Sequence, residues 1–116
     1  MGATVTDLGE GVYVSRIDTA EWEPDLEVGG SAHMLFEEGD AKVGLWRAEP
    51  GMREGPSDPI ELPARETVVV LEGTVTFGVV GGRTLELSAG DMASVPRGSR
   101  VTWDPSPGCK VIWIYS

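Results

Sequence analysis

The sequence predicts an all-β fold, either a sandwich or a barrel of short strands. The chain of 116 residues contains 16 glycines and 8 prolines, which are spread along it as turn signals and form no low-complexity tract. Short apolar runs alternate with these turns at regular intervals, which is typical of sandwiches and barrels. The sequence shows no helical hydrophobic period of useful length.

The first part of the chain is expected to alternate strands with polar loops. Residues 1–11 are polar and glycine-rich, so we expect an irregular start. The acidic stretch 18–30 contains Pro24 and Gly29-Gly30 and is predicted to be a loop. Strands are expected in three apolar runs bounded by turn signals, at residues 12–17, 32–36 and 42–48.

The second part is predicted to be one long loop followed by closely spaced strands. Pro56, Pro59 and Pro63 exclude a central strand or a helix interior from residues 52–65. Gly81-Gly82 predicts a tight hairpin turn, since both central positions can take a positive φ. Hydrophobic strands are expected at residues 66–71, 74–80, 83–87, 92–95, 100–104 and 110–115. We find no repeat and no linker, so residues 1–116 are predicted to form one domain.

Charge and cysteine content exclude several classes of partner. Nine Lys and Arg against 19 Asp and Glu give a formal net charge of −10, which disfavours nucleic acids and anionic membranes. A small anionic metabolite stays possible. Cys109 is the single cysteine, so no intrachain disulfide can form. With no basic segment leading into a long apolar run at the N-terminus, we expect a cytoplasmic protein.

Two spaced motifs resemble those of the cupin family. Glu66 is followed after six residues by Gly73, and Gly90 is followed after five residues by Pro96-Arg97-Gly98. The resemblance implies a single cupin-type jelly-roll β-barrel, that is, a double-stranded β-helix. It covers a core of about residues 42–116, and strands within residues 12–36 would pack on this barrel or across a homodimer.

Details of the motifs are similar to one branch of that family. The pairs Glu72-Gly73 and Gly90-Asp91, with Trp103 downstream, look like the branch that includes (S)-ureidoglycine aminohydrolase and an ethanolamine-utilisation cupin. That branch also includes many small proteins without a known function. We interpret Glu72 and Asp91 themselves as turn residues.

The departures from the family pattern concern the metal ligands. A cupin metal site uses two or three imidazoles and a carboxylate. The first two histidine positions fall on Ile60 and Leu62, or on Pro59 and Glu61, and the third falls on Val101. His33 is the one histidine and lies outside both motifs. We therefore predict no histidine-ligated metal and no cofactor.

Glu66 is the first candidate for a catalytic or ligand-binding role. The resemblance implies that it points into the barrel, and the alternation with Val68 and Val70 gives it apolar neighbours. Burial should raise its pKa, which suits a general acid, a general base or a ligand anchor. The alternative is a structural carboxylate bonded to a nearby Arg or Trp.

Other candidates form the wall of the predicted pocket. Trp46 and Trp103 offer ring faces and N–H donors, and Trp103 shares strand parity with Val101. Ordinary core packing is the alternative for both tryptophans. Trp113 and Tyr115 alternate on the final strand and would equally suit a dimer interface.

The remaining polar candidates have weaker support. Glu61 would pair with Glu66 in one register or be a solvated loop residue, and His33 is more typical of a structural hydrogen-bonding residue. Arg53 and Arg65 would grip an anion or be solvated at the surface. Cys109 has no histidine near it in sequence and is not expected to be a nucleophile.

Three functions are consistent with these residues. The first is a cupin that binds or converts a small polar metabolite without a histidine-ligated metal, using Glu61, Glu66, Trp46, Val101 and Trp103. The second is a non-catalytic sensor or dimeric scaffold. The third is an unorthodox metal-dependent aminohydrolase or lyase with carboxylate ligands, drawing on Glu61, Glu66 and His33. The sequence leaves open whether the protein is an enzyme.

Overall fold

The computed structural model describes residues 5–52 and 56–116, and these residues form strands and turns. Neither range contains a helix, and so neither contains one that could cross a membrane. The strands are β1 (Thr6–Gly9), β2 (Val12–Val14), β3 (Glu23–Pro24), β4 (Ser31–Glu38), β5 (Ala41–Ala48), β6 (Ile60–Glu61), β7 (Glu66–Val79), β8 (Thr84–Ser88), β9 (Met92–Val95), β10 (Arg100–Asp104) and β11 (Cys109–Tyr115). The all-β prediction is confirmed.

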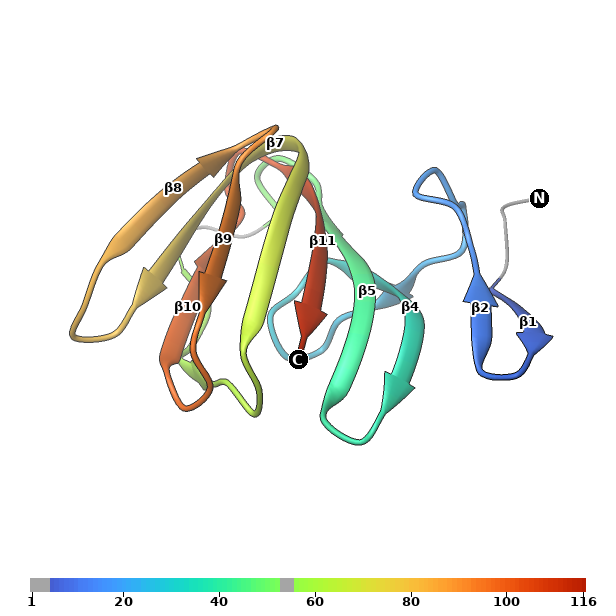
Figure 1. Ribbon diagram of the computed structural model, residues 1–116. Helices are drawn as coiled ribbons and strands as arrows, with labels where there is room; N and C mark the ends of the chain where they lie inside the picture. Colours follow the sequence, from blue (N-terminus) through green and yellow to red (C-terminus); the bar gives the residue numbers. More distant parts are fainter. Residues whose placement is uncertain (1–4, 53–55) are drawn as a thin grey trace.

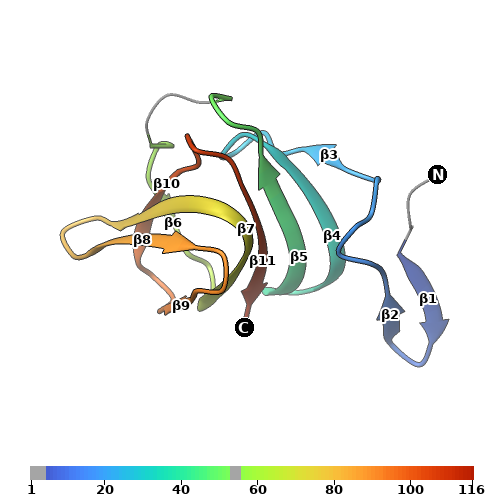
Figure 2. The ribbon, with the colours of Figure 1, turned by 90° about the horizontal axis from the view of Figure 1, so that it is seen from above.

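One curled antiparallel sheet contains most of these strands. Its order is β3-β4-β5-β11-β7-β10-β6, and β8 and β9 pair with β7 as well. The sheet curls into a half-barrel, which brings β10 and β6 round toward β5 and β4 (Figure 1, Figure 2). The inward side chains of β7, β10 and β11 form the core, with Val68, Val75, Phe77, Val101 and Val111 at most 1% exposed. The predicted jelly-roll barrel is the observed architecture.

Strand β7 is the element that joins the two halves of the half-barrel. Its first half pairs with β11 and β9, and its second half pairs with β10 and β8. Two separate strands with a turn at Glu72-Gly73 were predicted, and this prediction was wrong. Gly73 takes a φ of 73° inside a continuous strand, where the register to β11 also shifts. A Cβ at Gly73 would collide with the Gly108 carbonyl, so the bend requires glycine.

The N-terminal region differs from the expected irregular start. Strands β1 and β2 form a separate two-stranded sheet, which projects from the side of the half-barrel (Figure 1, Figure 2). The predicted strand 12–17 is shorter than expected and ends at Val14. The hairpin leaves Leu8, Val12 and Val14 exposed, at 63%, 46% and 48%.

Of two further connections, the described part of the proline-rich loop contains no central strand, as predicted, and the Gly81-Gly82 turn was mispredicted. The proline-rich loop contains a short strand, β6, which pairs with β10 at the edge of the sheet, a position where proline neighbours are tolerated. The turn at Gly81-Gly82 is longer than a two-residue hairpin, since four residues separate β7 from β8. Gly81 alone of the pair has a positive φ, of 76°.

Candidate functional site

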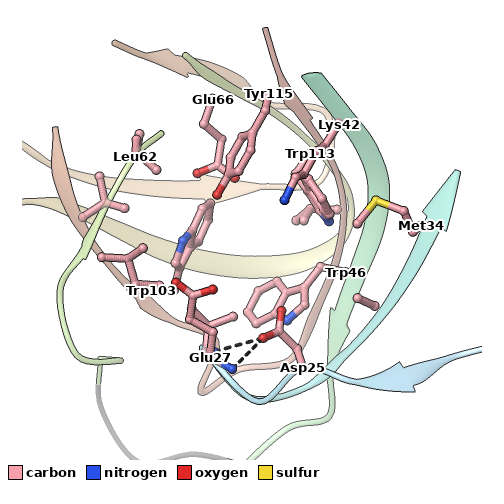
Figure 3. Close-up of a pocket in the computed structure, with 15 residues that line it drawn as sticks. Asp25, Glu27, Met34, Lys42, Trp46, Leu62, Glu66, Trp103, Trp113 and Tyr115 are labelled. Carbon is pink, nitrogen blue, oxygen red and sulfur yellow. Dashed lines mark hydrogen bonds between the residues drawn. The ribbon is translucent and has the colours of Figure 1, made fainter. Parts of the chain in front are cut away.

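The inner face of the half-barrel surrounds a cavity of ≈ 220 Å³ (Figure 3). Strands β4, β5, β6, β7, β10 and β11 contribute to its wall, together with the loop that follows β3. The lining residues are Asp25, Glu27, Val28, Ala32, Met34, Lys42, Trp46, Ile60, Leu62, Glu66, Val101, Trp103, Val111, Trp113 and Tyr115. A mostly apolar wall with a few polar groups is typical of a small-molecule site.

Glu66 is the buried polar group of this cavity. As the first residue of β7 it faces inward with Val68 and Val70, and it is 4% exposed. Its pairing partners are Tyr115 on β11 and Val95 on β9. Its Oε1 atom has no hydrogen-bond partner within residues 5–52 and 56–116. An unpaired buried carboxyl oxygen is costly, because it has lost its water without gaining a replacement.

The electrostatic surroundings of Glu66 keep its proton bound near neutral pH. Burial, and secondarily the negative charge of Glu27, raise the pKa of Glu66 from 4.5 to about 8. Burial likewise raises the pKa of Tyr115 well above its usual value, and Glu66 and Glu27 add to this effect. At neutral pH the Glu66 carboxyl is therefore largely protonated, and it can give or take a proton with little cost.

An aromatic wall lies beside the carboxyl. The Trp46 indole Nε1 donates a hydrogen bond of 2.8 Å to the Gly29 carbonyl. The Trp103 ring is stacked on Phe77 at 4.0 Å and lies 5.9 Å from the Trp46 ring, measured between centroids. These contacts fix both rings. The structure thus brings Trp46, Val101, Trp103 and Glu66 to one cavity.

The sequence reasoning missed an acidic segment at this cavity. Asp25 and Glu27 belong to the stretch predicted only as a loop, and both line the cavity. Asp25 Oδ1 accepts hydrogen bonds from the backbone N–H groups of Glu27 and Val28, at 2.9 and 3.1 Å (Figure 3). A loop sequence carries no signal of the strand face that it will cover.

Tyr115 and Trp113 also line the cavity, although a dimer interface was considered for them. Their alternation with Val111 along β11 places all three side chains on the inner face. That alternation was the signal that could have identified them. The rings of Trp113 and Tyr115 lie 5.2 Å apart between centroids.

Glu61 is the predicted site residue that the structure leaves outside the cavity. Ile60 and Leu62 line the cavity, so strand alternation turns the Glu61 side chain outward, where it is exposed. The structure therefore has the register that puts Ile60 and Leu62 inside. Glu61 and Glu66 do not form a pair at this site.

His33 is buried on the outer face of β4, away from the cavity. Its Nδ1 lies 2.8 Å from the Glu21 carbonyl and its Nε2 lies 2.7 Å from the Ser15 hydroxyl. A carbonyl can only accept, so Nδ1–H donates to it, and Nε2 forms the second hydrogen bond with the Ser15 hydroxyl. Both nitrogens are used in structural hydrogen bonds, in line with the interpretation from sequence.

The remaining candidates lie away from the cavity or outside the described residues. Arg65 is exposed and donates a hydrogen bond of 3.1 Å to the Ser94 hydroxyl. Arg53 lies outside the described residues. Cys109 begins β11 and is buried, and this burial raises the pKa of its thiol from 9.0 to about 11. At neutral pH the Cys109 thiol is therefore protonated and a poor nucleophile.

The family is decided by a match across the motif-bearing part of the chain. A family model described as the EutQ-like cupin domain matches residues 35–110. The chain belongs to the EutQ-like cupin family. A search of curated protein sequences finds no match.

Solved structures agree with this cupin fold. The chain is 18% identical to a putative ethanolamine utilization protein Q from Salmonella typhimurium LT2, with a TM-score of 0.79, and the match covers 97% of this chain and 92% of that one. It is 19% identical to the Clostridium difficile EutQ protein, with a TM-score of 0.75 and coverage of 99% and 88%. The polyketide cyclase RemF from Streptomyces resistomycificus is 22% identical, with a TM-score of 0.68 and coverage of 88% and 76%. Similarities at this level of identity establish the fold.

The cupin barrel raises the question of a metal, and the donor set here does not fit one. Imidazole donors would be needed at the inner face, and no histidine is found among the described residues that line the cavity, where Ile60, Leu62 and Val101 are apolar. Within the described residues, no group of three or more His, Cys, Asp or Glu side chains is placed to hold a metal ion.

Proposed function

We propose that residues 1–116 form a single cupin domain that binds a small polar metabolite in the cavity, with Glu66 as its anchor and without a histidine-ligated metal. One observation carries the proposal. Glu66 presents an unpartnered, buried carboxyl oxygen at the wall of a cavity of ≈ 220 Å³. Buried polar groups in native proteins are nearly always hydrogen-bonded, and a bound ligand would supply the missing partner.

The size and the wall of the cavity favour a small ligand. Its volume lies below the ~300–1,000 Å³ that is typical of drug-sized ligands, which favours a metabolite of few heavy atoms. A carboxyl with a pKa of about 8 is also suited to act as a general acid or base near neutral pH. Conversion of the bound metabolite would therefore use the same residue.

The metal-dependent alternative has less support. Its ligands would be Glu61 and Glu66, with His33 as an optional third, whereas Glu61 is exposed on β6 and His33 is bonded on the outer face of β4. The resemblance to (S)-ureidoglycine aminohydrolase depends largely on glycines and a proline, which build turns and bends and donate no ligand. We accordingly propose neither that reaction nor the activities of the structural relatives for this chain.

A thermal-shift screen tests the proposed binding. Small acids, amines, amides and sugars would be screened for a rise in melting temperature, because a ligand that binds the native state stabilises it by mass action. The best compound should lose most of its shift in Glu66→Gln and keep it in Glu61→Gln, the matched exposed control. Equal shifts in wild type and Glu66→Gln would reject Glu66 as the anchor.

A homodimer is the second proposal, and a specific surface favours it. The β1–β2 hairpin projects from the half-barrel and exposes Leu8, Val12 and Val14. A second copy that covers this hairpin would remove apolar surface and open strand edges from water. Light scattering should give about twice 12.4 kDa, and a mass near 12.4 kDa at micromolar concentration would contradict the dimer.

We also propose a cytoplasmic location. Cys109 is the single cysteine of the chain, so the fold uses no internal disulfide. Small domains in oxidising compartments commonly depend on such bonds.

A further inference from the structure

Acidic side chains outnumber basic ones around the cavity. Asp25 and Glu27 line it, and Glu66 adds a third negative charge when it is ionised, against one lining cation, Lys42. The Lys42 ammonium Nζ lies 3.4 Å from Glu37 Oε2, so a neighbouring carboxylate on β4 already balances its charge. The cavity is therefore suited to a positively charged ligand and poorly suited to an anion.

The aromatic residues of the cavity wall also favour a positively charged ligand. Trp46 on β5, Trp103 on β10, and Trp113 and Tyr115 on β11 all line the cavity. Figure 3 shows these rings and Glu66 around the same cavity. The face of an aromatic ring carries partial negative charge and attracts cations, more strongly when the site is shielded from water.

The unpartnered oxygen adds a requirement for a donor. Glu66 Oε1 is a buried acceptor without a partner in the described part of the chain, and Glu66 as a whole is 4% exposed. An ammonium N–H would satisfy the hydrogen bond and neutralise the charge of the carboxylate at once. A quaternary ammonium would supply the charge without the hydrogen bond. A carboxylate ligand could bond only to the protonated form of Glu66, and it would lie beside the negative charges of Asp25 and Glu27.

We propose that the cavity binds a small primary organic ammonium ion, with its N–H groups on Glu66 Oε1, its charge balanced by Glu66, Glu27 and Asp25, and its carbon skeleton against the tryptophans. This inference rests on the proposed function, since it names the class of ligand for the same cavity.

Binding of this kind is coupled to a proton. The titratable groups around Glu66 are Tyr115 on β11, Glu27 and Asp25 in the loop after β3, and Lys42 on β5, while its neighbour on β9 is the apolar Val95. The pKa of about 8 means that Glu66 is mostly protonated at pH 7. An arriving ammonium favours the ionised carboxylate, so the Glu66 proton passes to the buffer on binding. The affinity should rise by up to about tenfold per pH unit between pH 6 and 8, and then level off.

The four tryptophans provide a direct readout of this binding. Trp46, Trp103 and Trp113 line the cavity, whereas Trp22 lies outside it, with its indole N–H on the Thr19 carbonyl. In a ¹⁵N–¹H NMR spectrum of the full chain, assigned with single Trp→Phe variants, the Trp22 indole signal is the internal control. The probes are n-butylammonium, butan-1-ol, butanoate and tetramethylammonium, each titrated into the millimolar range at pH 6, 7 and 8.

The expected result is that n-butylammonium moves the cavity tryptophan signals and leaves Trp22 in place. Its dissociation constant should increase roughly tenfold to a hundredfold in Glu66→Gln, because the glutamine amide oxygen can still accept a hydrogen bond but lacks the charge of the carboxylate. It should be unchanged in Glu61→Gln. In wild type the affinity should be higher at pH 8 than at pH 6.

Other outcomes separate two kinds of failure. If butan-1-ol or butanoate binds as tightly as n-butylammonium, the cation is wrong while the proposed binding function stands. If tetramethylammonium binds as tightly, the hydrogen bond to Oε1 is refuted. If none of the four probes moves the cavity signals, both the ammonium ligand and the proposed binding cavity are contradicted.

Discussion

Two buried polar side chains, on opposite faces of the same curled sheet, have contrasting surroundings. His33 on β4 is 7% exposed, and both of its ring nitrogens have partners, Ser15 and the Glu21 carbonyl. Glu66 on β7 is 4% exposed, and its Oε1 has none among the described residues. The two residues are buried to a similar extent, so burial alone does not distinguish them.

The difference lies in whether the protein itself completes the hydrogen bonds. His33 ties the segment before β3 to the outer face of the sheet, so its burial is compensated within the fold. Glu66 faces a cavity, and its burial is not compensated by the chain. A buried polar group whose hydrogen bonds are all formed within the fold suggests a structural role. A buried polar group that lacks a hydrogen-bond partner beside a cavity suggests a ligand site.

The largest stability effect is expected at His33. His33→Ala should lower the free energy of unfolding by about 2–4 kcal/mol, because it opens a cavity and leaves the Ser15 hydroxyl and the Glu21 carbonyl without their partner. Urea unfolding measures this loss, with the neighbouring exposed Met34→Ala as a control that should cost less than about 1 kcal/mol. A loss at His33 no larger than the loss at Met34 would show that the buried hydrogen bonds of His33 do not stabilise the fold.

Glu66→Gln should raise the free energy of unfolding, in contrast to His33→Ala, and the size of this effect should depend on pH. The pKa of Glu66 is raised from 4.5 to about 8 in the folded protein, so the folded state binds the proton more tightly than the unfolded chain. The resulting stability is fully present below about pH 4.5 and is lost as the pH rises through 8. Relative to wild type, the variant should be nearly neutral at pH 4 and more stable by on the order of 1–3 kcal/mol at pH 9.

The control for that pH series is Glu61→Gln, which removes an exposed carboxyl outside the cavity. Its stability difference from wild type should stay within about 0.5 kcal/mol at every pH. If Glu66→Gln and Glu61→Gln followed the same curve from pH 4 to pH 9, the argument that Glu66 is buried without compensation would fail.

The smallest effect is expected for Ser15→Ala. This change removes one of the two hydrogen bonds of His33 and leaves the other in place, so the cost should be about 1 kcal/mol. The double variant Ser15→Ala/His33→Ala should lose less stability than the sum of the losses in the two single variants, because both changes remove the same hydrogen bond. Fully additive costs in urea unfolding would show that the Ser15–His33 bond contributes nothing to stability.

The positions of most strands and several residues of the site could be predicted from the sequence, because these features depend on local rules. The resemblance to cupins indicated that Glu66 points into the barrel, and strand alternation put Trp103 on the same face as Val101. The spacing of Gly73, Gly90 and Pro96 carried that resemblance. The positions of these residues depend on patterns among residues that are close to them in the sequence. Their placement therefore did not require knowledge of how the sheet closes.

Tertiary structure decided the features that depend on distant contacts. Gly73 is compatible with a turn and with a bend in a continuous strand, and only its approach to Gly108 selects the bend. The choice between the two registers of β6 follows from its pairing with β10, which puts Ile60 and Leu62 inside and Glu61 outside.

The acidic side of the cavity was likewise decided by closure of the barrel. The sequence by itself determined an all-β cupin with a buried Glu66 and no imidazole at the expected ligand positions. It did not determine that Asp25 and Glu27 would line the cavity that Glu66 faces, because a loop has no periodicity to indicate the face that it covers. The position of this loop depends on how the sheet curls, which is a property of the whole fold.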